Sequence, residues 1–405
     1  MITSYNLVVA VAALAFVPFV RRVHAREVAR AGLALFTVGS IGCAAAWTLE
    51  SLIIFRCVQG LGGALLLAGA LPVLGGLLGG RARGGRAWTA TGTFGAALGP
   101  ALGGVLTQLA DWRAIFIVQV PIAAAALLAT FDHRIHELPV EAPAPQKPGA
   151  RAANLGLALI FGGLVGALFL SVLLVITVWE RQPIAGALIV SALPAATLLA
   201  RPLSRRLGRR EGVSAGALLL AAGLVALALL PAISNTLVAL SLALCGLGLG
   251  LAVPPLTDDS LDAEHAPLRS GTITVGVRHI GLVAAVVLIA PLLTHELDGT
   301  QTPATLAGTR VILDGNIGLT QKIPIALAMR DEFEAAQQGA IPNLAKPFDD
   351  RGAAHDANLR HLRDTLLDTL RSVVTRAFRP AFLLSAAFAL LALLPARRLR
   401  ERAAA

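Results

Sequence analysis

The sequence has little charge: only 14% of its 405 residues are Asp, Glu, Lys or Arg, whereas 56% are hydrophobic. Its mean hydropathy of +0.73 and its repeated apolar runs of about twenty residues predict helices that cross a lipid bilayer. The scarcity of charge therefore excludes a soluble globular protein and predicts a multi-pass protein whose solvent is the bilayer.

Cysteines and catalytic groupings are also scarce. Cys43, Cys57 and Cys245 all lie in apolar spans, without the spacing of a disulfide framework or a metal site. Serine, histidine and acidic residues do not gather at the spacing of a nucleophile and its base. We therefore expect no enzyme activity, no metal and no cofactor.

The formal net charge of +10 is carried mostly by basic clusters in short turns between apolar spans. No basic domain with interleaved aromatic residues occurs, which argues against nucleic-acid binding. By the positive-inside rule these clusters predict cytoplasmic turns, an inner-membrane location and a cytoplasmic C-terminus. The clusters are Arg21, Arg22, Arg26 and Arg30; Arg81, Arg83 and Arg86; Arg201, Arg205, Arg206, Arg209 and Arg210; and Arg397, Arg398, Arg400 and Arg402.

Hydropathy divides the chain into two helical halves. We expect an N-terminal bundle over 1–131, a cytoplasmic linker over 132–153, a C-terminal bundle over 154–396 and a basic tail over 397–405. Eleven membrane helices are predicted, near 2–20, 29–47, 51–78, 86–107, 113–131, 154–178, 185–203, 212–231, 235–255, 271–294 and 377–396.

A charged insert over 295–376 separates the last two predicted spans and is expected to lie outside the cell. Apolar residues recur at helical spacing near its end and predict an amphipathic helix over 354–376, with Leu359, Leu362, Leu366, Leu370 and Val373 on one face. Two interpretations are open: a cap packed on the extracellular mouth, or a site for a partner.

The most informative stretch is 56–104. Gly95, Gly99 and Gly103 repeat every four residues, so we expect them to share a helix face that a neighbouring backbone approaches closely. Pro100 removes a backbone donor and invites a kink, and Gly104 follows. A glycine face by itself is also what any packed membrane helix shows.

The combination of motifs is more specific. Arg56-x-x-Gln59-Gly60-x-x-Gly63, the glycine–proline motif above and a following Trp112-Arg113-x-Ile-Phe together resemble the major facilitator superfamily, in particular the bacterial multidrug:proton antiporters. The resemblance implies an all-α fold of two helical bundles on a twelve-helix plan. It places Arg56 on family helix 4, where it would tune or relay a proton, and the glycine–proline "antiporter motif" on helix 5.

Two departures from the family pattern stand out. Residues 2–7 resemble the opening of family helix 2, so the first helix is expected to be absent, through a late gene start or in a truncated relative. The loops around Arg21, Arg22 and Arg26 and around Arg205, Arg206, Gly208, Arg209 and Arg210 resemble the family's cytoplasmic gate loops but have arginine at the aspartate position. They fit simple basic anchors as well as gates.

Proton coupling needs a titratable group at membrane depth, yet residues 1–131 contain only three acids, Glu27, Glu50 and Asp111, all at span ends. Arg56 is the leading coupling candidate, with a structural arginine bonded to helix-end carbonyls as the alternative. Glu180, Arg278 and His279 are further candidates. Each is predicted at a helix end, where an interfacial side chain is an equal alternative.

We expect export of small hydrophobic or amphiphilic compounds in exchange for protons, because the spans are poor in the polar pairs that sugars require. The partners are then a small-molecule substrate, protons and the lipid bilayer, and the protein is expected to be a monomer. The alternatives are a non-transporting homologue that acts as a receptor or scaffold through its insert, and an uptake permease.

Overall fold

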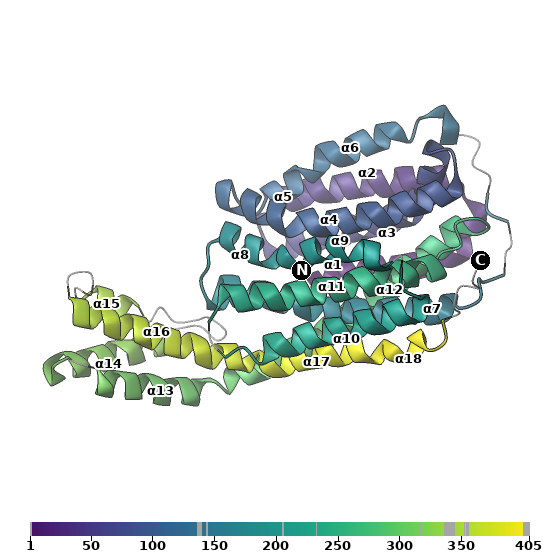
Figure 1. The fold of residues 1–405 in the computed structure, drawn as a ribbon. Helices are drawn as coiled ribbons and strands as arrows, with labels where there is room; N and C mark the ends of the chain where they lie inside the picture. Colours follow the sequence, from purple (N-terminus) through teal and green to yellow (C-terminus); the bar gives the residue numbers. More distant parts are fainter. Residues whose placement is uncertain are drawn as a thin grey trace.

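The computed structural model describes residues 2–135, 140–142, 145–204, 206–231, 233–315, 317–335, 345–351, 353 and 356–399. These residues form helices and connecting turns, without a strand among them (Figure 1). The all-α fold predicted from the sequence is confirmed.

The N-terminal half is built mainly from long helices. They are α1 (Ile2–Phe16), the 3-10 turn η1 (Val17–Arg22), α2 (Ala25–Ala44), α3 (Leu49–Leu77), α4 (Arg81–Leu109), α5 (Ala114–Ile117), α6 (Gln119–Ala129) and the short turn η2 (His133–Ile135). The C-terminal half contains α7 (Ala150–Val165), the π-helical segments η3 (Gly166–Leu170) and η4 (Leu173–Val178), α8 (Pro183–Val190), α9 (Ala192–Ser204), α10 (Arg209–Ala228), α11 (Asn235–Ser260), α12 (Pro267–Asp298), α17 (Arg379–Leu391) and α18 (Leu393–Ala396).

Two groups of helices lie side by side and meet along α1 and α4. The helix α1 packs on α3 of its own half and on α12 of the other, and α4 packs on α3 and on α8. At one end of the bundle the turns after α1, α3 and α9 carry the arginine clusters, and we call this the basic end. The opposite end carries the insert.

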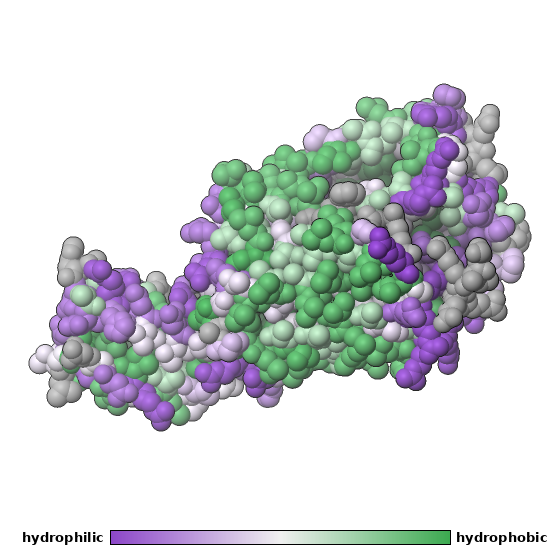
Figure 2. Space-filling model, viewed as in Figure 1, coloured by the Kyte–Doolittle hydropathy of each residue, from purple (hydrophilic) through white to green (hydrophobic). Residues whose placement is uncertain are grey.

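An apolar band covers the face of the bundle seen in Figure 2, between these polar ends. Within the described residues, nine helices are long and apolar enough to cross a membrane. The predicted spans 86–107 and 113–131 are not among the nine: they correspond to α4 and to the shorter apolar stretch Ala114–Ala129. All eleven predicted spans thus fall on helices, and the number that crosses the bilayer stays a prediction.

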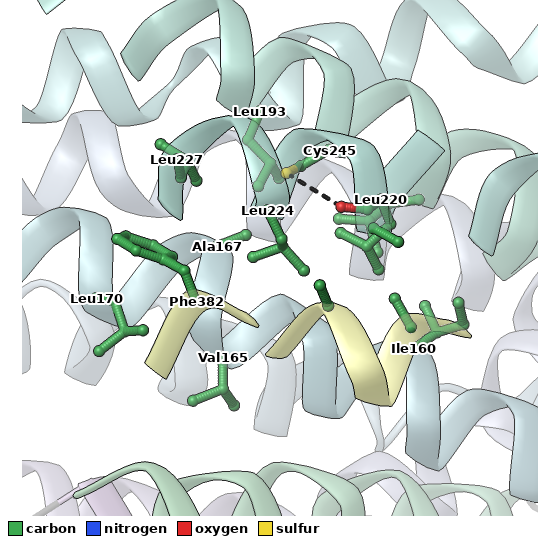
Figure 3. Close-up of a cluster of buried hydrophobic side chains, with 14 of the residues drawn as sticks. Ile160, Val165, Ala167, Leu170, Leu193, Leu220, Leu224, Leu227, Cys245 and Phe382 are labelled. Carbon is green, nitrogen blue, oxygen red and sulfur yellow. Dashed lines mark hydrogen bonds between the residues drawn. The ribbon is translucent and has the colours of Figure 1, made fainter. Parts of the chain in front are cut away.

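The C-terminal bundle has a continuous apolar core (Figure 3). Leu170, Leu220, Leu224 and Phe382, from three different elements, are almost completely buried there. The Cys245 thiol lies among them and donates to the Leu220 carbonyl oxygen at 3.7 Å. Such burial is typical of a cysteine that packs as a small apolar residue.

The insert forms a helical lobe, made of α13 (Gln301–Asp314), α14 (Leu319–Ala335), α15 (Lys346–Asp349) and α16 (Ala357–Ala377). The amphipathic helix predicted over 354–376 is α16, and Leu359, Leu362, Leu366 and Leu370 are buried in a lobe core that includes Phe348. The lobe extends away from the bundle in Figure 1 and does not cover its end. The expected cap is therefore wrong in its packing, because the apolar face of α16 is buried within the lobe itself.

Two contacts fix the lobe to the C-terminal half. The Trp179 indole N–H donates to Thr375 Oγ1 at 3.0 Å, and Arg371 pairs with Glu180 at 2.6 Å. The helix α16 also continues through α17 into α18 as one helical stretch, Ala357–Ala396.

Glycines join α2 to α3 at backbone contact. A Cβ added to Gly32 would lie 2.3 Å from the backbone nitrogen of Leu66. One added to Gly39 would lie 2.6 Å from that of Gln59, and one added to Gly62 would lie 2.4 Å from that of Phe36. Close approach of this kind is how helices associate where lipid supplies no hydrophobic drive.

We expect Gly62→Ala to lower the melting temperature of the solubilised full chain, because forcing a methyl group into a packed contact costs about 1–3 kcal/mol. Gly95→Ala is the matched control, since a Cβ at Gly95 would meet nothing within 4 Å. Its melting temperature should stay unchanged or rise, as alanine favours helix by about 1 kcal/mol. Equal melting of Gly62→Ala and the unmodified protein would contradict the proposed contact.

Candidate functional site

Arg56 lies in the interior of the N-terminal half. The helix α3 begins at a capping box in which Thr48 and Ser51 bond each other's backbone N–H groups, and Arg56 is its eighth residue. The Arg56 guanidinium donates to Gln59 Oε1 at 2.6 Å, one turn further along the same helix. A charge so far inside an apolar bundle needs such a polar partner.

Gln59 connects this arginine to two other helices. Its side chain is buried, and its amide nitrogen donates to Ser40 Oγ on α2 at 2.8 Å and to Gln119 Oε1 on α6 at 3.0 Å. Both amide protons and the carbonyl oxygen of Gln59 are thus used. We call Arg56, Gln59, Ser40 and Gln119 the polar network.

Tyr5 covers the network from α1. The Arg56 guanidinium lies 4.2 Å from the centre of the Tyr5 ring and 5.8 Å from that of Phe116, within cation–π range. Gly60 and Gly63 make room for Tyr5. A Cβ added to Gly60 would lie 2.9 Å from the Tyr5 carbonyl oxygen, and one added to Gly63 would lie 2.7 Å from the Tyr5 hydroxyl oxygen. The two motif glycines therefore let α1 reach Arg56.

The glycine–proline motif on α4 differs from the expectation. Among the described residues, an added Cβ at Gly95, Gly99 or Gly103 would meet nothing within 4 Å, so no described backbone approaches this face. Gly104 does pack closely, because a Cβ added to it would lie 2.3 Å from the Ala187 side chain on α8. Pro100 lies inside the unbroken helix α4. The four-residue spacing correctly predicted a shared face, but in this conformation the face is open.

Arg278 and His279 are not at a helix end, as the sequence suggested. The helix α12 begins at Pro267, four residues before the predicted span, so Arg278 is its twelfth residue. The guanidinium lies 4.8 Å from the Phe161 ring of α7 and 5.9 Å from the Trp88 ring of α4. The buried His279 ring bonds through Nδ1 to the Val275 carbonyl oxygen at 2.7 Å, within its own helix.

Glu180 lies apart from these groups. Its side chain is 66% exposed and pairs with Arg371 of the lobe. The carboxylate therefore belongs to the junction between the bundle and the lobe, not to the membrane interior.

The loops predicted as cytoplasmic gates occupy the basic end. Arg21 and Arg22 are exposed in η1, and Arg26 pairs with Glu27 at 3.0 Å. In the second loop Arg206 and Arg210 are exposed, Gly208 is the N-cap of α10, and Arg209 pairs with Asp259 of α11. Arg205 lies outside the described residues. The Arg209–Asp259 pair joins the start of α10 to α11 of the same bundle.

The two halves also meet at the basic end. Arg81 of α4 donates to the Glu264 carbonyl oxygen, beside a cavity of about 490 Å³ between the halves. Glu141 of the linker accepts the backbone N–H groups of Leu268 and Arg269 at 2.9 and 3.0 Å, where α12 begins. Burial raises the pKa of the Glu141 carboxyl above its ordinary value, and these two hydrogen bonds only partly offset that effect.

Sequence reasoning missed Tyr5, Ser40, Gln119, Trp88 and Phe161 as site residues. The chain contains no tyrosine other than Tyr5, and that rarity was the available signal for it. Among the described residues, no three His, Cys, Asp or Glu side chains gather as a metal site would require.

Comparison with known proteins identifies related chains. The family model described as Major Facilitator Superfamily matches residues 1–311. The putative multidrug resistance proteins MdtD of Salmonella typhimurium and Salmonella typhi are each 38% identical over 134 residues, which are 32% of this chain and 28% of the relative. The match thus spans less than a third of these curated relatives.

Solved structures share the fold. A bacterial homologue of the human lysosomal transporter Spinster, inward-facing and unoccupied, is 14% identical with a TM-score of 0.58 over 99% of this chain and 91% of that one. A D-xylose-proton symporter is 14% identical with a TM-score of 0.52, over 70% and 76% of the two chains. At such low identity the likeness extends to the fold alone.

The Tyr5–Gly63 contact can be tested by compensation. Gly63→Ala should lower the melting temperature, because its Cβ would collide with the Tyr5 hydroxyl oxygen. Adding Tyr5→Phe removes that oxygen, so the double variant should recover part of the loss, with Tyr5→Phe alone as the reference. Additive effects of the two substitutions would contradict the contact.

Proposed function

Because the chain belongs to the Major Facilitator Superfamily of membrane transporters, we propose that it exports small hydrophobic or amphiphilic compounds in exchange for protons. The similarity to proteins named for multidrug resistance supports export. The observation that carries the proposal is the half-buried Arg56, held by the polar network within an apolar bundle.

The network gives Arg56 a defined role in coupling. A guanidinium keeps its proton in proteins, so Arg56 does not act as the proton carrier. Its fixed charge in a low-dielectric interior instead disfavours protonation of any titratable group that faces the same space. A substrate that enters that space would alter the influence of Arg56 on such a group, and proton release would then be coupled to substrate movement.

Alternating access requires the two bundles to separate at one end while they close at the other. The contacts that would be exchanged are those between the halves: α1 on α12, α4 on α8, and Arg81 on the α11–α12 turn. The open face of Gly95, Gly99 and Gly103 is a surface on which another helix can close in a second conformation.

We further propose that the basic end faces the cytoplasm and that the lobe lies outside the inner membrane. Charge asymmetry of the turns supports this orientation. The loops around Arg21, Arg22 and Arg26 and around Arg206, Gly208, Arg209 and Arg210 would then move with their bundles as parts of the cytoplasmic gate.

Arg56 variants test the coupling role. In inverted vesicles with an acidic lumen and a panel of amphiphilic dyes of either charge in the outer medium, Arg56→Ala should abolish dye uptake. Arg56→Lys should retain about a tenth or less of the rate, because it keeps the charge but loses the planar fork that bonds Gln59. The exposed Arg181→Ala is the matched control.

Membrane abundance separates coupling from folding. Both Arg56 variants should accumulate like the unmodified protein. Normal dye transport by Arg56→Ala would overturn the coupling role, and its loss from the membrane would make Arg56 a structural residue.

A further inference from the structure

The membrane helices carry cations in their interior but carboxylates only at their ends. In α1–α12 and α17–α18, as the structure describes them, every carboxylate lies within three residues of a helix end. Arg56 and Arg278 lie far deeper, as the eighth residue of α3 and the twelfth of α12. No carboxylate among the described residues pairs with either guanidinium.

Arg278 lies where the two halves meet. Glycines bring its helix close to both neighbours: Gly276 packs on Leu14 of α1, and Gly281 on the Ala158 backbone of α7. The guanidinium is stacked near Phe161 of the C-terminal half and Trp88 of the N-terminal half. Its Nε is buried and has no hydrogen-bond partner among the described residues.

Tyr5 lies on α1, the helix that packs on both α3 and α12. Its ring centre lies 4.2 Å from the Arg56 guanidinium. One turn beyond Trp88 on α4, a Cβ added to Gly92 would meet nothing within 4 Å among the described residues. The surroundings of Arg278 are thus two aromatic rings and, on α4, a position that no described residue covers.

A buried cation without a counter-charge is costly, and aromatic contacts offset only part of that cost. An anionic group would supply the missing charge and would accept the free N–H of Arg278, while an apolar body would lie on Phe161 and Trp88. We propose that this inter-bundle site binds the anionic group of an amphiphilic organic anion, such as an aryl carboxylate or sulfonate. The proposal rests on the transport function above and names its substrate class.

The test compares three compounds with one ring system: 2-naphthalenesulfonate, its uncharged sulfonamide and 2-naphthylmethylammonium. Each is assayed as an inhibitor of whichever dye the full chain moves in inverted vesicles. The sulfonate should inhibit at a concentration about tenfold or more below the sulfonamide, because charge-assisted hydrogen bonds discriminate by at least that factor. The ammonium compound should be the weakest inhibitor.

Arginine variants locate the preference. The measured quantity is the inhibitory concentration of the sulfonamide divided by that of the sulfonate. Arg278→Gln should reduce this ratio to near one, Arg278→Lys should retain part of the preference, and the exposed Arg181→Gln should leave the ratio unchanged. Even if Arg278→Gln fails to accumulate, the ratio measured on the unmodified protein tests whether the site prefers an anion, and Arg278→Lys tests the assignment to Arg278.

The outcomes separate the two proposals. If no dye is moved, the transport function fails and this inference with it. If a dye is moved but the sulfonamide or the ammonium compound inhibits as well as the sulfonate, export stands and the anion site is wrong. If the preference survives in Arg278→Gln, the anion binds elsewhere and the assignment to Arg278 is overturned.

Discussion

The backbone contact between α2 and α3 sets the position of the whole site. Lipid supplies no hydrophobic drive between membrane helices, so α2 and α3 associate through glycines that let their backbones touch. This contact brings Ser40 within 2.8 Å of Gln59, which in turn holds Arg56 and reaches Gln119. Gly60 and Gly63, on the same helix, admit Tyr5 from α1. One packing arrangement therefore orients residues from four helices.

The charges placed by this packing are unusual for a bilayer interior. Two guanidinium groups lie at depth, and the carboxylates of the described helices stay at their ends. Buried charges seldom stabilise a fold, because the free-energy cost of removing them from water exceeds the free energy gained from their contacts. Arg56 recovers part of the cost from Gln59 and Tyr5, and Arg278 from Phe161 and Trp88. What is still missing is a negative charge, which a substrate can carry.

Much of the fold could be predicted from the sequence, because hydropathy and the motif spacing are local signals. The predicted span 51–78 corresponds to α3, Leu49–Leu77, and the leucine pattern from Leu359 to Leu370 correctly predicted the buried face of α16. The membership of the Major Facilitator Superfamily, inferred from those motifs, is confirmed.

The wrong predictions concern the tertiary neighbours of a residue, which the spacing of residues along the sequence does not determine. The repeat of Gly95, Gly99 and Gly103 defined a face but not its neighbour, and the face is open. Arg278 was predicted at a helix end, whereas α12 begins at Pro267, which makes Arg278 its twelfth residue. Ser40, Gln59 and Gln119 come from three helices, so only the tertiary packing reveals their contact.

The central claim is that the interior arginines are retained for function at a cost in stability. Its most direct test is the melting temperature of the full chain with Arg278→Met, a flexible apolar side chain that fits between the same rings. Removing an uncompensated buried cation should raise the melting temperature by about 2 °C or more, whereas the exposed Arg181→Met should leave it unchanged. A lower melting temperature for Arg278→Met would show that the arginine stabilises the fold, and would contradict the account.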